Sequence, residues 1–198
     1  SWKAAKMPVA GWVDWPTVYA EFLTSLPADQ GFYSTSSAKL NETLASEPPF
    51  ILDVREASEV EATGYIIGSV NIPVRDVLKN LDKLPTPDKK IVVTCASGHR
   101  GSITMMALRM LGYENVVNLG GGINGWKKAE LPLEAGVPAV ATVINASPSV
   151  DATRLAGLDA YLSALPEGFF TVKPVDLNTE LGTEPKPVIL DVRTSEET

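Results

Sequence analysis

A short apolar run at residues 91–94 ends at Cys95, the chain's only cysteine, and passes directly into a glycine-containing turn. The turn reads Ala96-Ser97-Gly98-His99-Arg100, and a helical pattern follows it. A strand, a tight loop and a helix in this order are building blocks of a fold in which helices cover a parallel sheet. This one feature constrains the fold and the chemistry of the loop together.

The loop has the composition of an anion cradle. Its backbone N–H groups can point at an anion on the sulfur, and the N-terminus of the following helix adds partial positive charge. Both effects favour the thiolate, which is the reactive form of cysteine. Arg100 supplies a rigid fork of donors suited to an oxyanion, and His99 is the chain's only histidine. A lone cysteine at a strand end is often a core residue, but this context favours a catalytic or sulfur-carrying Cys95.

Composition excludes several other functions. The 198 residues are 44% hydrophobic, which indicates a globular chain of one or two domains, and the net charge of −7 argues against a nucleic-acid partner. One cysteine and one histidine allow neither an internal disulfide nor zinc-ligand spacing, so we expect no cofactor and no metal. No apolar run has the length of a membrane span. Linkers rich in Ala, Thr, Ser and Pro favour an extracytoplasmic over a cytoplasmic setting.

An internal repeat sets the domain organisation. Three blocks recur in the same order at an offset of 137 to 139 residues: 22–27 as 161–166, 31–33 as 168–170, and 50–55 as 188–193. We therefore predict a complete domain at residues 1–133, a linker at 134–149, and the front part of a second copy at 150–198. The second copy has no counterpart of the Cys95 loop. Its strand at residues 188–192 would need a partner, so we expect it to be disordered, docked on the first domain or paired with another chain.

Strands alternate with helices through the first domain. The pattern predicts helices at 14–26, 38–45, 56–63, 75–81, 102–111 and 120–126, and strands at 50–54, 70–72, 91–94 and 115–119. Short apolar strands between helices indicate an α/β fold with a parallel sheet flanked by helices on both faces. Ligands of such folds bind beyond the carboxyl ends of the strands, where Cys95 lies.

Three linked motifs resemble the rhodanese family of sulfurtransferases. They are Leu52-Asp53-Val54-Arg55 followed by residues 64–73, the loop from Cys95 to Arg100, and the segment 118–126. Together they cover about residues 50–133, and the repeat resembles tandem rhodanese domains. The resemblance implies a rhodanese-like domain plus the N-terminal part of a second one.

The resemblance also implies a mechanism. Cys95 would attack the outer sulfur of a small anionic donor such as thiosulfate, hold it as a persulfide, and give it to a thiol or cyanide acceptor. Backbone N–H groups from Ala96 through Gly98 to Arg100 would cradle the persulfide. Arg100 and His99 would attract the donor, and Ser97 would offer its hydroxyl.

The chain departs from the family pattern at two positions. Tyr65 stands where the family often has His, away from the chemistry. Gly101 belongs to the loop but replaces a frequent Ser that could cap the helix.

Asp53 is expected to form a structural salt bridge, whereas Arg55 fits either that bridge or anion binding. The glycines at 120–122 are expected to let backbone approach the Cys loop closely.

Two other functions compete with small-molecule sulfur transfer. Protein tyrosine phosphatases use a longer loop between Cys and Arg than the four residues found here, which disfavours a phosphate substrate. A sulfur-relay or binding module would load Cys95 in the same way but pass the sulfur to a protein partner, and the sequence does not separate this function from turnover.

Overall fold

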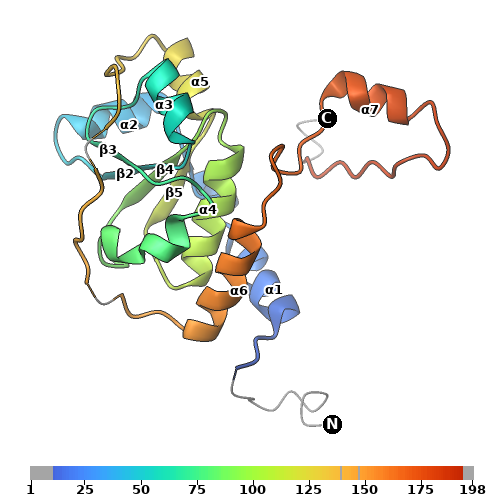
Figure 1. Ribbon diagram of the computed structural model, residues 1–198, viewed down its shortest axis with the longest axis horizontal. Coiled ribbons are helices and arrows are strands. Elements are labelled where there is room, and N and C mark those ends of the chain that lie inside the picture. Colours follow the sequence, from blue (N-terminus) through green and yellow to red (C-terminus); the bar gives the residue numbers. More distant parts are fainter. Residues whose placement is uncertain (1–10, 139, 147, 194–198) are drawn as a thin grey trace. The chain divides into compact units, whose positions relative to one another are not determined.

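The computed structural model describes residues 11–138, 140–146 and 148–193, and within these it contains one five-stranded sheet (Figure 1). The sheet order is β1-β5-β4-β2-β3, and all neighbouring strands are parallel. The strands are β1 (Ser34–Thr35), β2 (Phe50–Asp53), β3 (Ser69–Asn71), β4 (Ile91–Thr94) and β5 (Val116–Leu119). The predicted parallel α/β architecture is therefore confirmed, with β4 as the central strand that leads to Cys95.

Helices cover both faces of the sheet, as the apolar strands require. On one face, α2 (Ser37–Leu44) and α5 (Gly122–Lys128) contribute Leu40 and Trp126 to a core cluster with Ile51 and Val92 of the sheet. On the other face, α4 (His99–Met110) packs on β4 and β5, and α1 (Trp15–Ser25) packs on α4. The remaining elements of this part of the chain are α3 (Ala57–Thr63) and the 3₁₀ segments η1 (Ala28–Gln30) and η2 (Val77–Lys83).

The helix starts follow from capping residues. Asp14 caps α1, accepting hydrogen bonds from the backbone N–H and the hydroxyl of Thr17, and Pro16 occupies the first turn. Ser36 caps α2 through the backbone N–H of Lys39 at 3.2 Å. These two helix starts confirm the prediction.

Three elements differ clearly from the prediction. Helix α4 begins at His99 rather than at residue 102, because Gly98 takes a left-handed conformation (φ 99°) that ends the loop early. The predicted helix at 75–81 is the 3₁₀ segment η2. The edge strand β1 was not predicted, since two residues between turns carry no periodic signal.

A buried ion pair closes the end of β2. The Asp53 and Arg55 side chains are 0% and 2% exposed, and Arg55 Nη2 lies 2.6 Å from Asp53 Oδ2. Arg55 also donates to Thr63 Oγ1 at 2.6 Å and to the Gly64 carbonyl at 2.8 Å. Asn71 of β3 donates to the Asp53 and Arg55 carbonyls. Together these hydrogen bonds connect the end of β2 to β3 and to the last turn of α3.

Helix α6 (Ala152–Ser163) lies beyond the predicted linker and packs in the same compact unit as the sheet, a unit that runs to Ala164. Its Leu158 and Leu162 are buried at 1% and 0% exposure. Its Gly157 lies so close to the Trp15 ring that a Cβ there would come within 2.3 Å of it. Helix α6 therefore packs beside α1. By the internal repeat, it is also the sequence counterpart of α1.

The second compact unit begins at Leu165 and contains α7 (Pro174–Glu180). Residues 188–192, predicted as a strand that would need a partner, pair with no other strand within the described residues. Val188 and Leu190 are 95% and 81% exposed, whereas the matching Phe50 is half-buried and the matching Leu52 is fully buried. A strand needs neighbouring backbone groups, and the residues described here do not supply them.

We expect Leu162→Ala to lower the free energy of unfolding by about 2 to 5 kcal/mol, since it empties a fully buried site. Tyr161→Ala, on the exposed side of the same helix, should have a much smaller effect. Urea denaturation of both variants measures the difference. Equal losses would show that α6 does not pack as described.

We expect Asp53→Ala to destabilise the domain by about 3 to 5 kcal/mol, because it leaves the Arg55 guanidinium buried without its carboxylate. Asp191→Ala is the matched control: Asp191 and Arg193 form the same bidentate pair, but in an exposed setting. Its removal should leave the main unfolding transition unchanged. Thermal unfolding followed by circular dichroism compares the two.

Candidate active site

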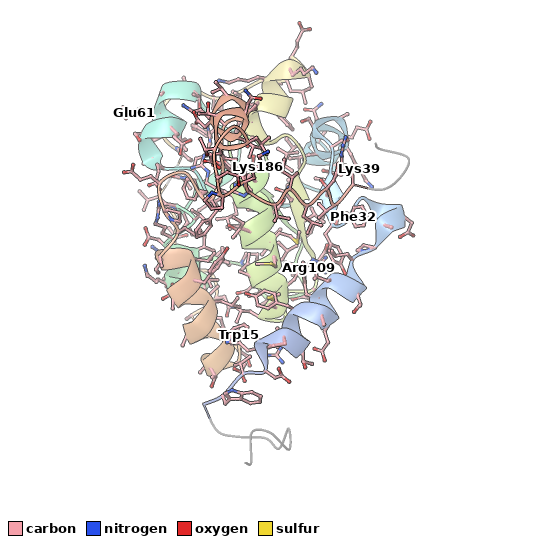
Figure 2. All side chains as sticks on the ribbon, turned by 90° about the vertical axis from the view of Figure 1, so that its right-hand side faces the viewer. Trp15, Phe32, Lys39, Glu61, Arg109 and Lys186 are labelled. Atoms are coloured by element: carbon pink, nitrogen blue, oxygen red, sulfur yellow. The ribbon has the colours of Figure 1, made fainter. Side chains whose placement is uncertain are left out.

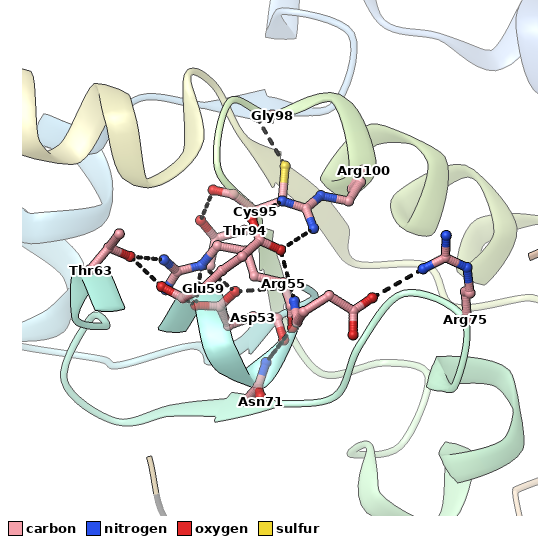
Figure 3. A network of polar contacts seen from close by, with 11 residues as sticks. Asp53, Arg55, Glu59, Thr63, Asn71, Arg75, Thr94, Cys95, Gly98 and Arg100 are labelled. Atoms are coloured by element: carbon pink, nitrogen blue, oxygen red, sulfur yellow. Dashed lines mark hydrogen bonds and ion pairs between the residues drawn. The ribbon is translucent and has the colours of Figure 1, made fainter. Parts of the chain in front are cut away.

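Cys95 lies at the carboxyl end of the central strand, where the sequence places the reactive group. The residue is 1% exposed. Its Sγ accepts a hydrogen bond from the backbone N–H of Gly98 at 3.1 Å (Figure 3). Gly98 itself is left-handed and leads the chain from this loop into α4. The loop therefore presents at least one donor to a negative charge on Cys95.

The loop carbonyls are held by other donors. The Cys95 carbonyl accepts from the N–H of Ile123 at 2.8 Å, and the Ala96 carbonyl accepts from the N–H of Asn124 at 2.9 Å. This contact needs Gly122, because a Cβ there would lie 2.3 Å from the Cys95 carbonyl oxygen. The prediction that the glycines at 120–122 permit close backbone approach is confirmed, and Gly122 is the residue that makes the contact.

Arg100 forms a two-pronged ion pair with Glu59 of α3. Arg100 Nη1 lies 2.6 Å from Glu59 Oε2, and Nη2 lies 2.7 Å from Oε1. The Arg100 side chain is 9% exposed and that of Glu59 36%. Figure 3 shows the guanidinium between this carboxylate and the Cys95 sulfur. The fork that the sequence predicted for the donor is thus already bound to a carboxylate of the protein.

This pairing shifts both ionisation equilibria. The hydrogen bond from Arg100 lowers the pKa of Glu59 below its usual value. The hydrogen bond to Glu59 raises the pKa of Arg100, and the neighbouring Cys95 sulfur adds to the same shift. Both groups are therefore charged over the physiological pH range, and Arg100 faces Cys95 as a fixed cation.

The other predicted loop residues surround this centre. Ser97 and His99 are exposed, and Ala96 is half-buried. Gly101 packs against β5, where a Cβ would lie 2.2 Å from Asn118 Oδ1. Asn118 in turn donates to Ser102 Oγ at 2.9 Å. The glycine at this position is explained by the Asn118 side chain that occupies the space.

Arg55 lies near the loop but its donors are engaged elsewhere. The ion pair with Asp53 and the hydrogen bonds to Thr63 and Gly64 hold its guanidinium inside the domain. Of the two roles considered for Arg55, this geometry favours the structural one.

A cleft of about 360 Å³ opens beside the loop, between α3 and α5. Ala96 and Glu59 contribute to its wall, so the cleft reaches the groups that surround Cys95. Ser58, Asn124 and Lys127 supply exposed polar groups to its lining. The volume suits a small molecule or an extended side chain.

Comparison with known proteins agrees with this geometry. Residues 36–129 match the rhodanese-like domain. The chain is also 32% identical over 100 residues to a sulfurtransferase from Allochromatium vinosum, an alignment that covers 50% of this chain and 92% of that protein. The chain belongs to the rhodanese-like family.

Two other relatives match this chain over a smaller share of their own length. An adenylyltransferase and sulfurtransferase, uba4 of Ogataea parapolymorpha, is 33% identical over 85 residues, which are 42% of this chain and 21% of that protein. YrkF of Bacillus subtilis, whose name describes a candidate sulfur carrier, is 36% identical over 76 residues, or 38% of this chain and 40% of that protein. This chain thus spans well under two thirds of these two relatives.

Glu59 was not among the site residues predicted from the sequence of this rhodanese-like domain. A signal was present: Glu56 and Glu59 have the spacing of a capping pair at the start of a helix, and Glu59 Oε2 accepts the Glu56 N–H at 3.0 Å. Capping explains the residue locally and gives no hint that its carboxylate also reaches Arg100, 41 residues further along the chain.

We expect Gly122→Ala to cost about 1 to 3 kcal/mol more stability than Gly112→Ala. Both glycines have positive φ angles, but a Cβ at position 112 would meet open space. The comparison isolates the steric clash with the Cys95 carbonyl from backbone strain. Urea denaturation measures it, and equal losses would contradict the close approach of α5 to the loop.

Within the described residues, no helix of the rhodanese-like chain combines the length and the apolar character needed to cross a membrane.

Proposed function

We propose that this chain is a sulfurtransferase that carries a sulfane sulfur on Cys95. The observation that supports this proposal is the position of the Cys95 sulfur, which receives the Gly98 N–H and faces the Arg100 guanidinium. Both groups stabilise negative charge on sulfur, and both a thiolate and a persulfide carry such a charge.

The reaction proceeds in two nucleophilic steps. The Cys95 thiolate attacks the outer sulfur of a donor such as thiosulfate, a new S–S bond forms, the donor S–S bond breaks, and sulfite leaves with the bonding electron pair. A thiophile such as cyanide or a thiolate then attacks the outer sulfur of the persulfide. The Cys95 thiolate leaves and is ready for another cycle.

The cradle proposed around the persulfide consists of backbone donors from Ala96 to Arg100. Gly98 supplies the donor that already contacts the sulfur. Ser97 and His99 are both exposed, which supports the proposal that they contact the donor or acceptor. His99 and the Ser97 hydroxyl thus remain proposed substrate contacts.

A sulfur relay to a protein partner is the alternative. The uba4 and YrkF relatives have names that describe sulfur handling in other settings, and exposed loop residues would suit contact with another protein. A relay module would form the same Cys95 persulfide but would turn over cyanide poorly.

We also propose that residues 150–193 are the front part of a second rhodanese-like fold, joined to the domain at 1–133 by the linker at 134–149. Local geometry repeats between the copies. Phe32 and Tyr33 have φ angles of 54° and 60°, and Phe169 and Phe170 have 51° and 58°. Arg193 binds Asp191 in the same bidentate way as Arg55 binds Asp53.

The test of the proposed function is sulfur loading of Cys95. After treatment with a sulfane-sulfur donor, intact mass of the wild type should increase by one sulfur atom, and cyanide should remove it as thiocyanate. Cys95→Ser should do neither, whereas Ser97→Ala should still load. Absence of the added sulfur in the wild type with every donor tried would overturn the proposal, and loading without thiocyanate would favour the relay.

A further inference from the structure

Two arginines near the Cys95 loop, Arg55 and Arg100, are paired with carboxylates of the protein before any donor arrives. Glu59 holds Arg100 with bonds of 2.6 and 2.7 Å. Asp53 holds Arg55 in the same two-pronged way. Each carboxylate offsets the charge of its arginine at longer range, so an approaching donor meets a weaker positive field than two unpaired cations would give.

The Glu59 carboxylate is placed to act on a donor as well as on Arg100. Its side chain is 36% exposed, unlike the buried Asp53, and it contributes to the wall of the cleft beside Ala96. A donor that approached the Cys95 loop through this cleft would bring its charged end past this carboxylate. Repulsion between like charges rises in proportion to the charge of the donor.

We propose that Glu59 is a specificity-determining residue that disfavours dianionic sulfur donors relative to donors with a single negative charge. The inference rests on the proposed sulfur transfer by Cys95 and adds the donor class. It also modifies the interpretation of Arg100 as a free anchor for an inorganic dianion: this cation is fixed by Glu59 and serves the sulfur of Cys95.

Two donors separate charge from chemistry. Thiosulfate carries two negative charges, and the methanethiosulfonate anion carries one, with a methyl group in place of an oxyanion. In both, the Cys95 thiolate attacks the outer sulfur and forms the same Cys95 persulfide. The S–S bond of the donor breaks, and either sulfite or methanesulfinate leaves with the electron pair. The ratio of their kcat/KM values therefore reports discrimination by charge.

Glu59→Gln removes the charge and keeps the shape. Glutamine retains a carbonyl oxygen that can accept the Glu56 N–H, so the start of α3 is preserved. Glu61→Gln is the matched control: it removes the same charge from the same helix at an exposed position (Figure 2). An effect of net charge alone would be the same in both variants.

We expect Glu59→Gln to shift the kcat/KM ratio toward thiosulfate by about tenfold at low ionic strength, and Glu61→Gln to shift it much less. A structural loss of Arg100 positioning would lower both rates together and leave the ratio unchanged, which would overturn the inference but not the proposed function. Failure of the wild type to load sulfur from either donor would overturn the proposed function and the inference with it.

Discussion

The buried pair of Asp53 and Arg55 is the interaction on which the site depends. Arg55 spans from the end of β2 to the last turn of α3, through Thr63 Oγ1 and the Gly64 carbonyl. Because α3 is fixed there, Glu59 on the same helix reaches Arg100 and places its guanidinium beside Cys95. Asp53 therefore makes no contact with the sulfur. It affects the position of Arg100 beside Cys95 indirectly, through Arg55 and helix α3.

The features that could be predicted from the sequence are those determined by residues close together in the chain. The apolar runs at β2 and β4, the starts of α1 and α2 to within one residue, and the Cys95 loop could all be predicted, because each is determined by spacing within one segment. The role of the glycines at 120–122 was also foreseen, since a glycine run after a strand indicates close backbone approach.

Contacts between distant segments were not readable. Nothing near Glu59 in the sequence indicates that it meets Arg100, and nothing near Gly101 indicates that Asn118 fills the space above it. The segment at 188–192 shows the same dependence on distant parts of the chain. Its residues have the pattern of β2, but a pattern supplies no partner, and pairing decides whether an apolar run becomes a strand.

Cys95 is the only sulfhydryl in this chain. Under the proposed sulfur transfer, a persulfide formed on it would have no second thiol within these 198 residues that could capture the outer sulfur or close an internal disulfide. The outer sulfur would then leave only when a nucleophile from outside these residues arrives. The lifetime of the loaded form would be set by the concentration of that nucleophile.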